Sequence, residues 1–181
     1  MAMTEEQARI RGYLTAQGTK LSPAELIEKV RLAMGELRTA VTSVAASRFS
    51  DRPAAEDWSA NEVMAHVVTT GARFAERITR ILDGGASDSA VADSIEAGVP
   101  RRTAEEWLTQ FESDRASLFD RVLHAQPDAN LDRTITHPFF GPLNWRETLL
   151  FTRLHDLDHA GQLGKIAVAF GATPPPGASP R

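Results

Sequence analysis

The sequence predicts an all-α protein, and more specifically a four-helix bundle. Three observations support this prediction: helix-start motifs recur along the chain, amphipathic segments follow them, and no strand-period segment of any length is present. The 181 residues, of which 42% are hydrophobic, suffice for one substantial core but not for a second full domain. Bundles build ligand sites from side chains that point inward from facing helices, so a functional site is expected between helices.

Helix starts are marked by capping side chains that stand three residues before a glutamate. Such a pair satisfies two backbone amides that have no partner in the first turn of a helix. The strong pairs are Ser22/Glu25, Ser59/Glu62, Thr103/Glu106 and Asn144/Glu147. A weaker pair, Thr4/Gln7, opens a short N-terminal helix. The chain therefore has four long helices and one short one.

The apolar pattern after each start predicts where the long helices end. They are expected at residues 22–47, 60–82, 103–123 and 145–170, the second and fourth ending at glycines. The loop 51–57 is short, the loop 84–102 is long enough to be mobile or to cross the end of a bundle, and 127–143 contains three prolines. Within the last of these, 134–136 could pair briefly as a strand.

Three regions follow from this pattern. Residues 1–21 hold the short helix and a lead-in, 22–171 form the bundle, and 172–181 form a Pro-rich tail that is expected to be disordered.

Composition excludes several classes of function. The chain has no cysteine, so thiolate metal ligation is not available, and its net charge of −4 comes from interleaved signs, which disfavours nucleic acid as a partner. No run of apolar residues reaches a membrane span, and the N-terminus has no export signal. A soluble cytoplasmic protein that binds a small molecule is the expectation.

Two histidines four residues apart, His155 and His159, are the most informative feature of the chain. On a helix this spacing places both imidazoles on one face with Cβ atoms about 5–6 Å apart, close enough to share one cation. His66, at the edge of the apolar stripe of helix 60–82, is the candidate third ligand. Separate hydrogen bonds to each ring are the alternative. Three imidazoles suit zinc, nickel, iron or copper, so ligand type alone does not name the metal.

Polar residues near these histidines are candidates for supporting roles. Glu62, Asp158 and Gln162 are the candidate catalytic groups and the candidate acceptors for imidazole N–H groups. Arg73 and Arg77, on the same helix as His66, could clamp a carboxylate of a cofactor or substrate, or could instead be solvated helix-surface side chains.

Two further histidines have lesser roles. His137 lies in the loop before the last helix and is a reserve ligand. His124 lies near the end of helix 103–123, where it is expected to interact with exposed carbonyls.

The last long helix carries a second apolar stripe away from the histidine face. Burial on two sides indicates a central helix or a homodimer seam, which the small glycines of this helix would permit. The stripe consists of Leu150, Leu154, Leu157, Gly161 and Val168.

Three segments together resemble the DinB-like superfamily: Asp57–His66, His137–Leu143, and His155–His159 with Gln162. The resemblance implies a four-helix bundle in the order up-up-down-down with a long crossover, and frequent dimers. It also implies a divalent metal, often nickel or zinc, held by three histidines, which here are His66, His155 and His159.

The resemblance also suggests an activity. Relatives include thiol-dependent S-transferases and isomerases that use mycothiol or bacillithiol. The leading hypothesis is a metal-dependent transferase that joins a low-molecular-weight thiol to an electrophilic small molecule. Two alternatives stay open: metal-assisted hydrolysis with Glu62 as the base, and a non-catalytic stress protein in which the metal only links two helices.

Overall fold

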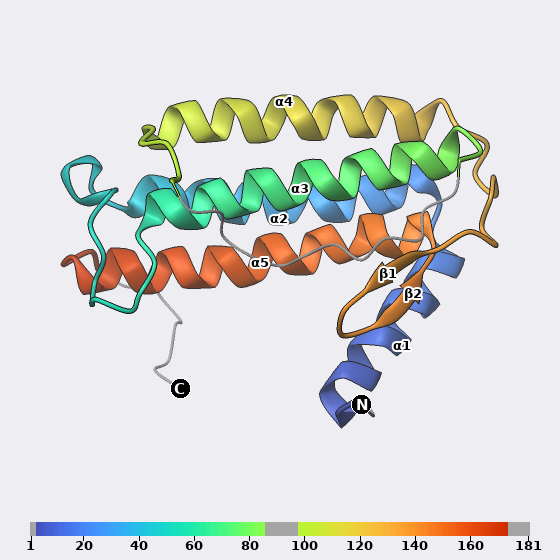
Figure 1. Ribbon diagram of the computed structural model, residues 1–181, viewed down its shortest axis with the longest axis horizontal. Helices are drawn as coiled ribbons and strands as arrows, with labels where there is room; N and C mark the ends of the chain where they lie inside the picture. The colour runs from blue at the N-terminus through green and yellow to red at the C-terminus, as the bar shows by residue number, and fades with distance from the viewer. Residues whose placement is uncertain (1–2, 86–97, 174–181) are drawn as a thin grey trace.

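The computed structural model describes residues 3–85 and 98–173. Four long helices lie side by side, and a fifth, N-terminal helix extends away from one end of them (Figure 1). The elements are α1 (Glu5–Lys20), α2 (Pro23–Ser43), the 3₁₀ turn η1 (Ala46–Arg48), α3 (Ala60–Leu82), α4 (Ala104–Leu123), β1 (Ile135–His137), β2 (Gly141–Leu143) and α5 (Trp145–Ala169). The predicted all-α four-helix bundle is confirmed. Most of the predicted tail and residues 86–97 of the predicted long loop lie outside the described residues.

Every predicted helix start is confirmed. A complete capping box, with both reciprocal hydrogen bonds, opens each of the five helices, at Thr4, Ser22, Ser59, Thr103 and Asn144. These motifs act within four residues, so their effect does not depend on the rest of the fold.

Two helix lengths differ from the prediction. The N-terminal helix α1 is longer than expected, at 16 residues, because Leu14 on one of its faces is buried in the core. Helix α2 ends at Ser43 rather than near Ser47. There the chain becomes extended at Val44 and turns, so that both Val44 and Phe49 are buried at 4% exposure.

Helices α3 and α4 run parallel to each other. At their starts, Trp107 Nε1 donates a hydrogen bond to Asn61 Oδ1 at 2.9 Å. At their ends, Arg121 pairs with Asp83 at 2.5 Å. The end of α3 and the start of α4 therefore lie at opposite ends of the bundle, about 34 Å apart for a 23-residue helix.

Helices α2 and α5 run parallel to each other and antiparallel to α3. The end of α2 meets the end of α5, where the Arg48 guanidinium lies 4.4 Å from the Phe170 ring centre. Phe74, in the second half of α3, contacts Phe151, in the first half of α5. The order is thus up-down-down-up, which corrects the expected up-up-down-down. The physical reason is that the connection between α2 and α3 buries Val44 and Phe49 where α2 ends and α3 begins, so this connection reverses the chain, and the crossover falls between α3 and α4.

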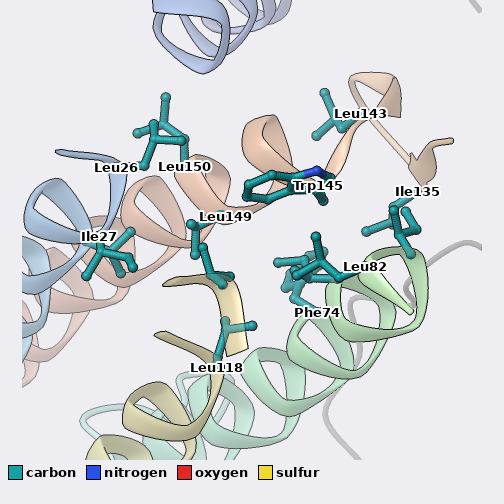
Figure 2. Close-up of a cluster of buried hydrophobic side chains, with 14 of the residues drawn as sticks. Leu26, Ile27, Phe74, Leu82, Leu118, Ile135, Leu143, Trp145, Leu149 and Leu150 are labelled. Carbon is teal, nitrogen blue, oxygen red and sulfur yellow. The ribbon is translucent and has the colours of Figure 1, made fainter. Parts of the chain in front are cut away.

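All four long helices contribute to both hydrophobic clusters of the core, which the predicted apolar stripes largely identify. Trp145 is fully buried among side chains of α3, α5 and the hairpin (Figure 2). Its Nε1 donates a hydrogen bond to the Ala129 carbonyl at 2.8 Å. Leu123, at the C-terminal end of α4, is 53% exposed although it continues the apolar pattern of that helix.

The second apolar stripe of α5 is buried only in part. Leu150 is fully buried, whereas Val168 is 43% exposed. Leu154 and Leu157 are half-buried and Gly161 is exposed. A homodimer seam on this face stays a prediction.

A short β-hairpin precedes α5. Its strands pair antiparallel, with Ile135 opposite Leu143, and both side chains are buried in the core. The pattern at 134–136 predicts the first strand, but the second strand contains Pro142 and carries no strand signal. Gly141, at φ +69°, provides the left-handed backbone of the turn. No helix in the described part of the chain is long and apolar enough to cross a membrane.

Candidate metal centre

Three histidines from two helices converge in the structure. His66 on α3 and His155 and His159 on α5 each offer a ring nitrogen, and these nitrogens all lie within 4.8 Å of one another. The Nε2 atoms of His66 and His155 are 3.1 Å apart. The rings of His155 and His159 are 4.5 Å apart, centre to centre, as expected for a spacing of four residues on one helix face. The structure therefore brings together the three predicted ligands.

His66 is more buried than its place at the edge of an apolar stripe indicates, with only 4% of its surface exposed. Helix α3 lies between α4 and α5, so more than one stripe of its surface is covered. The sequence shows one stripe and cannot show how many neighbours a helix has.

The other nitrogen of each ring faces an oxygen atom. Nδ1 of His159 lies 2.9 Å from Gln162 Oε1, and Nδ1 of His66 lies 3.5 Å from Thr70 Oγ1. Nδ1 of His155 lies 3.7 Å from a carboxylate oxygen of Asp156. Oxygen partners on Nδ1 favour the tautomer that leaves the Nε2 lone pair available to a shared ion. Gln162 thus lies beside His159, and its supporting role stays a prediction.

The carboxylate beside His155 is that of Asp156, whereas the candidate Asp158 is exposed and its role stays a prediction. The two positions differ by 200° around the helix axis, and the structure buries Asp156 completely while Asp158 is exposed. Asp156 accepts hydrogen bonds from Nη2 of Arg115 on α4, at 2.9 and 3.1 Å. Arg115 was not among the candidate residues because it comes from a third helix and has no spacing relation to the histidines.

Glu62 is occupied by structural contacts. Its carboxylate completes the capping box with Ser59 and forms an ion pair with Arg52. Burial raises the pKa of the Glu62 carboxyl, but hydrogen bonds from Arg52 and Ser59 outweigh burial, so the pKa lies below the ordinary value of 4.5. A carboxylate with a lowered pKa and these partners is poorly suited to the role of a general base.

Arg73 lies about two helical turns along α3 from His66, and Arg77 about three turns; both are half-buried. Arg73 lines a cavity between α3 and α4 that His66 and Trp107 also line, whereas Arg77 is not part of that lining. The predicted anion clamp is therefore compatible with the position of Arg73, and its role stays a prediction.

His137 does not join the cluster of ligands. Its Nδ1 accepts hydrogen bonds from the backbone N–H groups of Phe139 and Phe140, at 3.2 and 3.3 Å. A neutral ring with this acceptor carries its proton on Nε2, which leaves no lone pair for a metal. The role of reserve ligand is thus not supported.

His124 lies at the exposed C-terminal end of α4. Its Nδ1 lies 2.8 Å from the Asp120 carbonyl oxygen. This is the predicted interaction with a carbonyl of the last helical turn.

Aromatic side chains surround the three histidines. The Trp58 ring lies 5.4 Å from that of His66 and is stacked on that of His159 at 6.5 Å, centre to centre. Phe151 and Phe74 lie 6.3 and 6.5 Å from His155. Apolar walls limit the water around the centre and strengthen electrostatic interactions inside it.

Comparisons with known proteins agree with this architecture. The model of the DinB superfamily matches residues 29–163. The solved structure of TT2238, described as a four-helix bundle protein, is 21% identical with a TM-score of 0.59, and the match covers 80% of this chain and 99% of that one. YfiT from Bacillus subtilis, described as a probable metal-dependent hydrolase with an unusual four-helix bundle topology, is 12% identical with a TM-score of 0.65, over 83% of this chain and 89% of that one. No curated protein matches the chain.

Proposed function

Because the chain belongs to the DinB superfamily and brings three imidazoles together, we propose that it is a divalent-metal-dependent enzyme that acts on a small molecule. The observation that carries the proposal is the convergence of His66, His155 and His159, whose ring nitrogens lie within 4.8 Å of one another. Three protein ligands are the number that catalytic sites use when they keep a coordination position open.

The donor set fits such an ion. Two nitrogens bound to one ion at about 2.1 Å lie about 3.0–3.4 Å apart, for angles between octahedral and tetrahedral. The Nε2 atoms of His66 and His155 are 3.1 Å apart, within this range. A direct hydrogen bond between the two rings would also give this distance, but it does not account for a third ring nitrogen in the same place. Nickel and zinc are the proposed metals.

The proposed reaction is transfer of a low-molecular-weight thiol to an electrophilic small molecule, with mycothiol or bacillithiol as the thiol. When bound, the ion lowers the pKa of a thiol or water that reaches its open position. The chain has no cysteine, so the thiol must come from a second substrate. Trp58, Phe74 and Phe151 provide the apolar surroundings in which a thiolate is more reactive than in water.

Hydrolysis is the second candidate, because YfiT, which shares the fold, is described as a probable metal-dependent hydrolase. In this chain the base cannot be assigned to Glu62, whose carboxylate is engaged by Arg52 and Ser59. A hydrolase would therefore need another proton acceptor.

The experiment that tests the proposal loads the purified protein with Zn²⁺ or Ni²⁺ and measures two reactions side by side. One is consumption of a low-molecular-weight thiol with a generic electrophile, and the other is hydrolysis of an activated ester. Thiol consumption that disappears in the His155→Ala variant supports the transferase, and ester hydrolysis alone supports the hydrolase. Full metal occupancy with neither reaction would contradict both and favour a metal that only links α3 to α5.

A further inference from the structure

A fully buried ion pair adjoins the histidine cluster without belonging to it. The side chains of Asp156 and Arg115 are 0% and 3% exposed. We propose that Asp156 is a positioning residue for the metal ligand His155, and that Arg115 holds the carboxylate in place. This inference rests on the proposed function, since it assigns two residues to the support of the same centre.

The geometry places the carboxylate on the outer side of the His155 ring. Oδ1 of Asp156 lies 3.7 Å from Nδ1 of His155, while Nε2 of the same ring faces His66 at 3.1 Å. A carboxylate at this position favours a proton on Nδ1 and therefore a lone pair on Nε2. Metal ligands of this kind commonly donate their second N–H to a carboxylate, which also increases the basicity of the ligand.

Arg115 is itself held by α3 and α4. The guanidinium lies against the backbone of α3 at Gly71, where an added Cβ would be 3.6 Å from Nη2, and it lies 5.2 Å from the ring centre of Phe111. Both carboxylate oxygens of Asp156 accept from the same Nη2. The carboxylate is therefore fixed from α4, although the ligands come only from α3 and α5.

Stability alone is a weak explanation for this pair. Burying two charges costs several kcal/mol of desolvation. Replacing such a pair with apolar side chains of similar volume often leaves the stability of the protein unchanged or increases it. A pair that lies beside a ligand has a use that an apolar replacement lacks, because a carboxylate attracts the proton of Nδ1 and an apolar side chain does not.

The test compares Asp156→Asn with a matched control on the same helix. Glu147→Gln also neutralises a buried carboxylate of α5, which is 5% exposed and accepts from the Thr15 hydroxyl at 2.8 Å. It lies eight residues, or about 12 Å, from His155. Zn²⁺ affinity is measured by competition with a chelator. We expect it to fall about 10–100-fold in Asp156→Asn and to stay unchanged in Glu147→Gln.

Two further measurements check the proposal independently of the single variant. Asp156→Asn combined with Arg115→Met should bind Zn²⁺ no more weakly than Asp156→Asn alone, because the arginine acts through the carboxylate. In the metal-free wild-type protein, long-range ¹H–¹⁵N NMR should show His155 with its proton on Nδ1, a result that does not depend on any variant folding.

The outcomes separate the two proposals. Wild-type affinity in a folded Asp156→Asn variant, or a proton on Nε2 of His155, would overturn the positioning role while leaving the metal centre intact. A wild-type protein that binds no Zn²⁺ or Ni²⁺ would overturn both.

Discussion

Replacing His66 with phenylalanine should remove the stabilisation that a bound ion gives to the bundle. His66 is the member of the histidine cluster that lies on α3, so without it a bound ion could no longer link α3 to α5. Phenylalanine keeps a ring of similar size in contact with Trp58 and His159, whose ring centres lie 5.4 and 4.8 Å away. The metal-free variant loses the contacts of His66 with Nε2 of His155 and with the Thr70 hydroxyl, so it should be destabilised by about 1–3 kcal/mol.

The size of this stabilisation follows from the linkage between metal binding and folding. At a free metal concentration of about 100 times Kd, an ion that binds only the folded state adds about 2.7 kcal/mol. For a chain of this size each kcal/mol shifts Tm by about 2–4 °C, so the wild-type protein should gain about 5–11 °C. If the loss of one ligand weakens binding about 100-fold, the same concentration adds about 0.4 kcal/mol, or about 1–2 °C.

The assay is thermal unfolding with chelator and with Zn²⁺, for the wild type, His66→Phe and His124→Ala. His124 is exposed at the end of α4, outside the cluster, so its variant should retain the wild-type metal shift. A His66→Phe protein that keeps the full shift would refute the idea that the three imidazoles share one ion. The same control also excludes non-specific binding of Zn²⁺ to surface histidines.

Three other variants, with Leu32→Ala as a surface control, test the fold. Asn61→Ala leaves the Trp107 indole N–H, bonded to Asn61 at 2.9 Å, without an acceptor, and should cost about 2–3 kcal/mol in urea denaturation. The pKa of Glu62 in the folded protein is lowered. Its contribution to the free energy of unfolding is therefore complete above the ordinary pKa of 4.5 and is lost as the pH falls through the lower folded pKa. The metal-free Glu62→Gln protein should therefore lose less unfolding free energy than the wild type between about pH 6 and about pH 3, and an equal loss would contradict this. Leu149→Ala, at a fully buried position, should cost about 2–5 kcal/mol, whereas Leu32→Ala, at a position 71% exposed, should change stability by less than about 0.5 kcal/mol.

The histidine site shows which of its features can be predicted from the sequence alone. His155, His159 and Gln162 lie within eight residues of one helix, so their common face follows from helical geometry alone. Helical geometry does not show which carboxylate, Asp156 or Asp158, lies beside the cluster, because both stand next to a histidine in the sequence. Only the position of α4 decides it, since Arg115 on that helix meets the side of α5 on which Asp156 lies.

The sequence by itself determined where the helices begin and which residue types can bind a metal, because capping and helix periodicity act over three or four residues. The tertiary structure decided the relative directions of the helices, the burial of His66, the pairing of Arg115 with Asp156 and the second strand of the hairpin. Each of these depends on which helices become neighbours and how each is rotated about its axis. That choice is made by packing among residues far apart in the chain, and no local pattern encodes it.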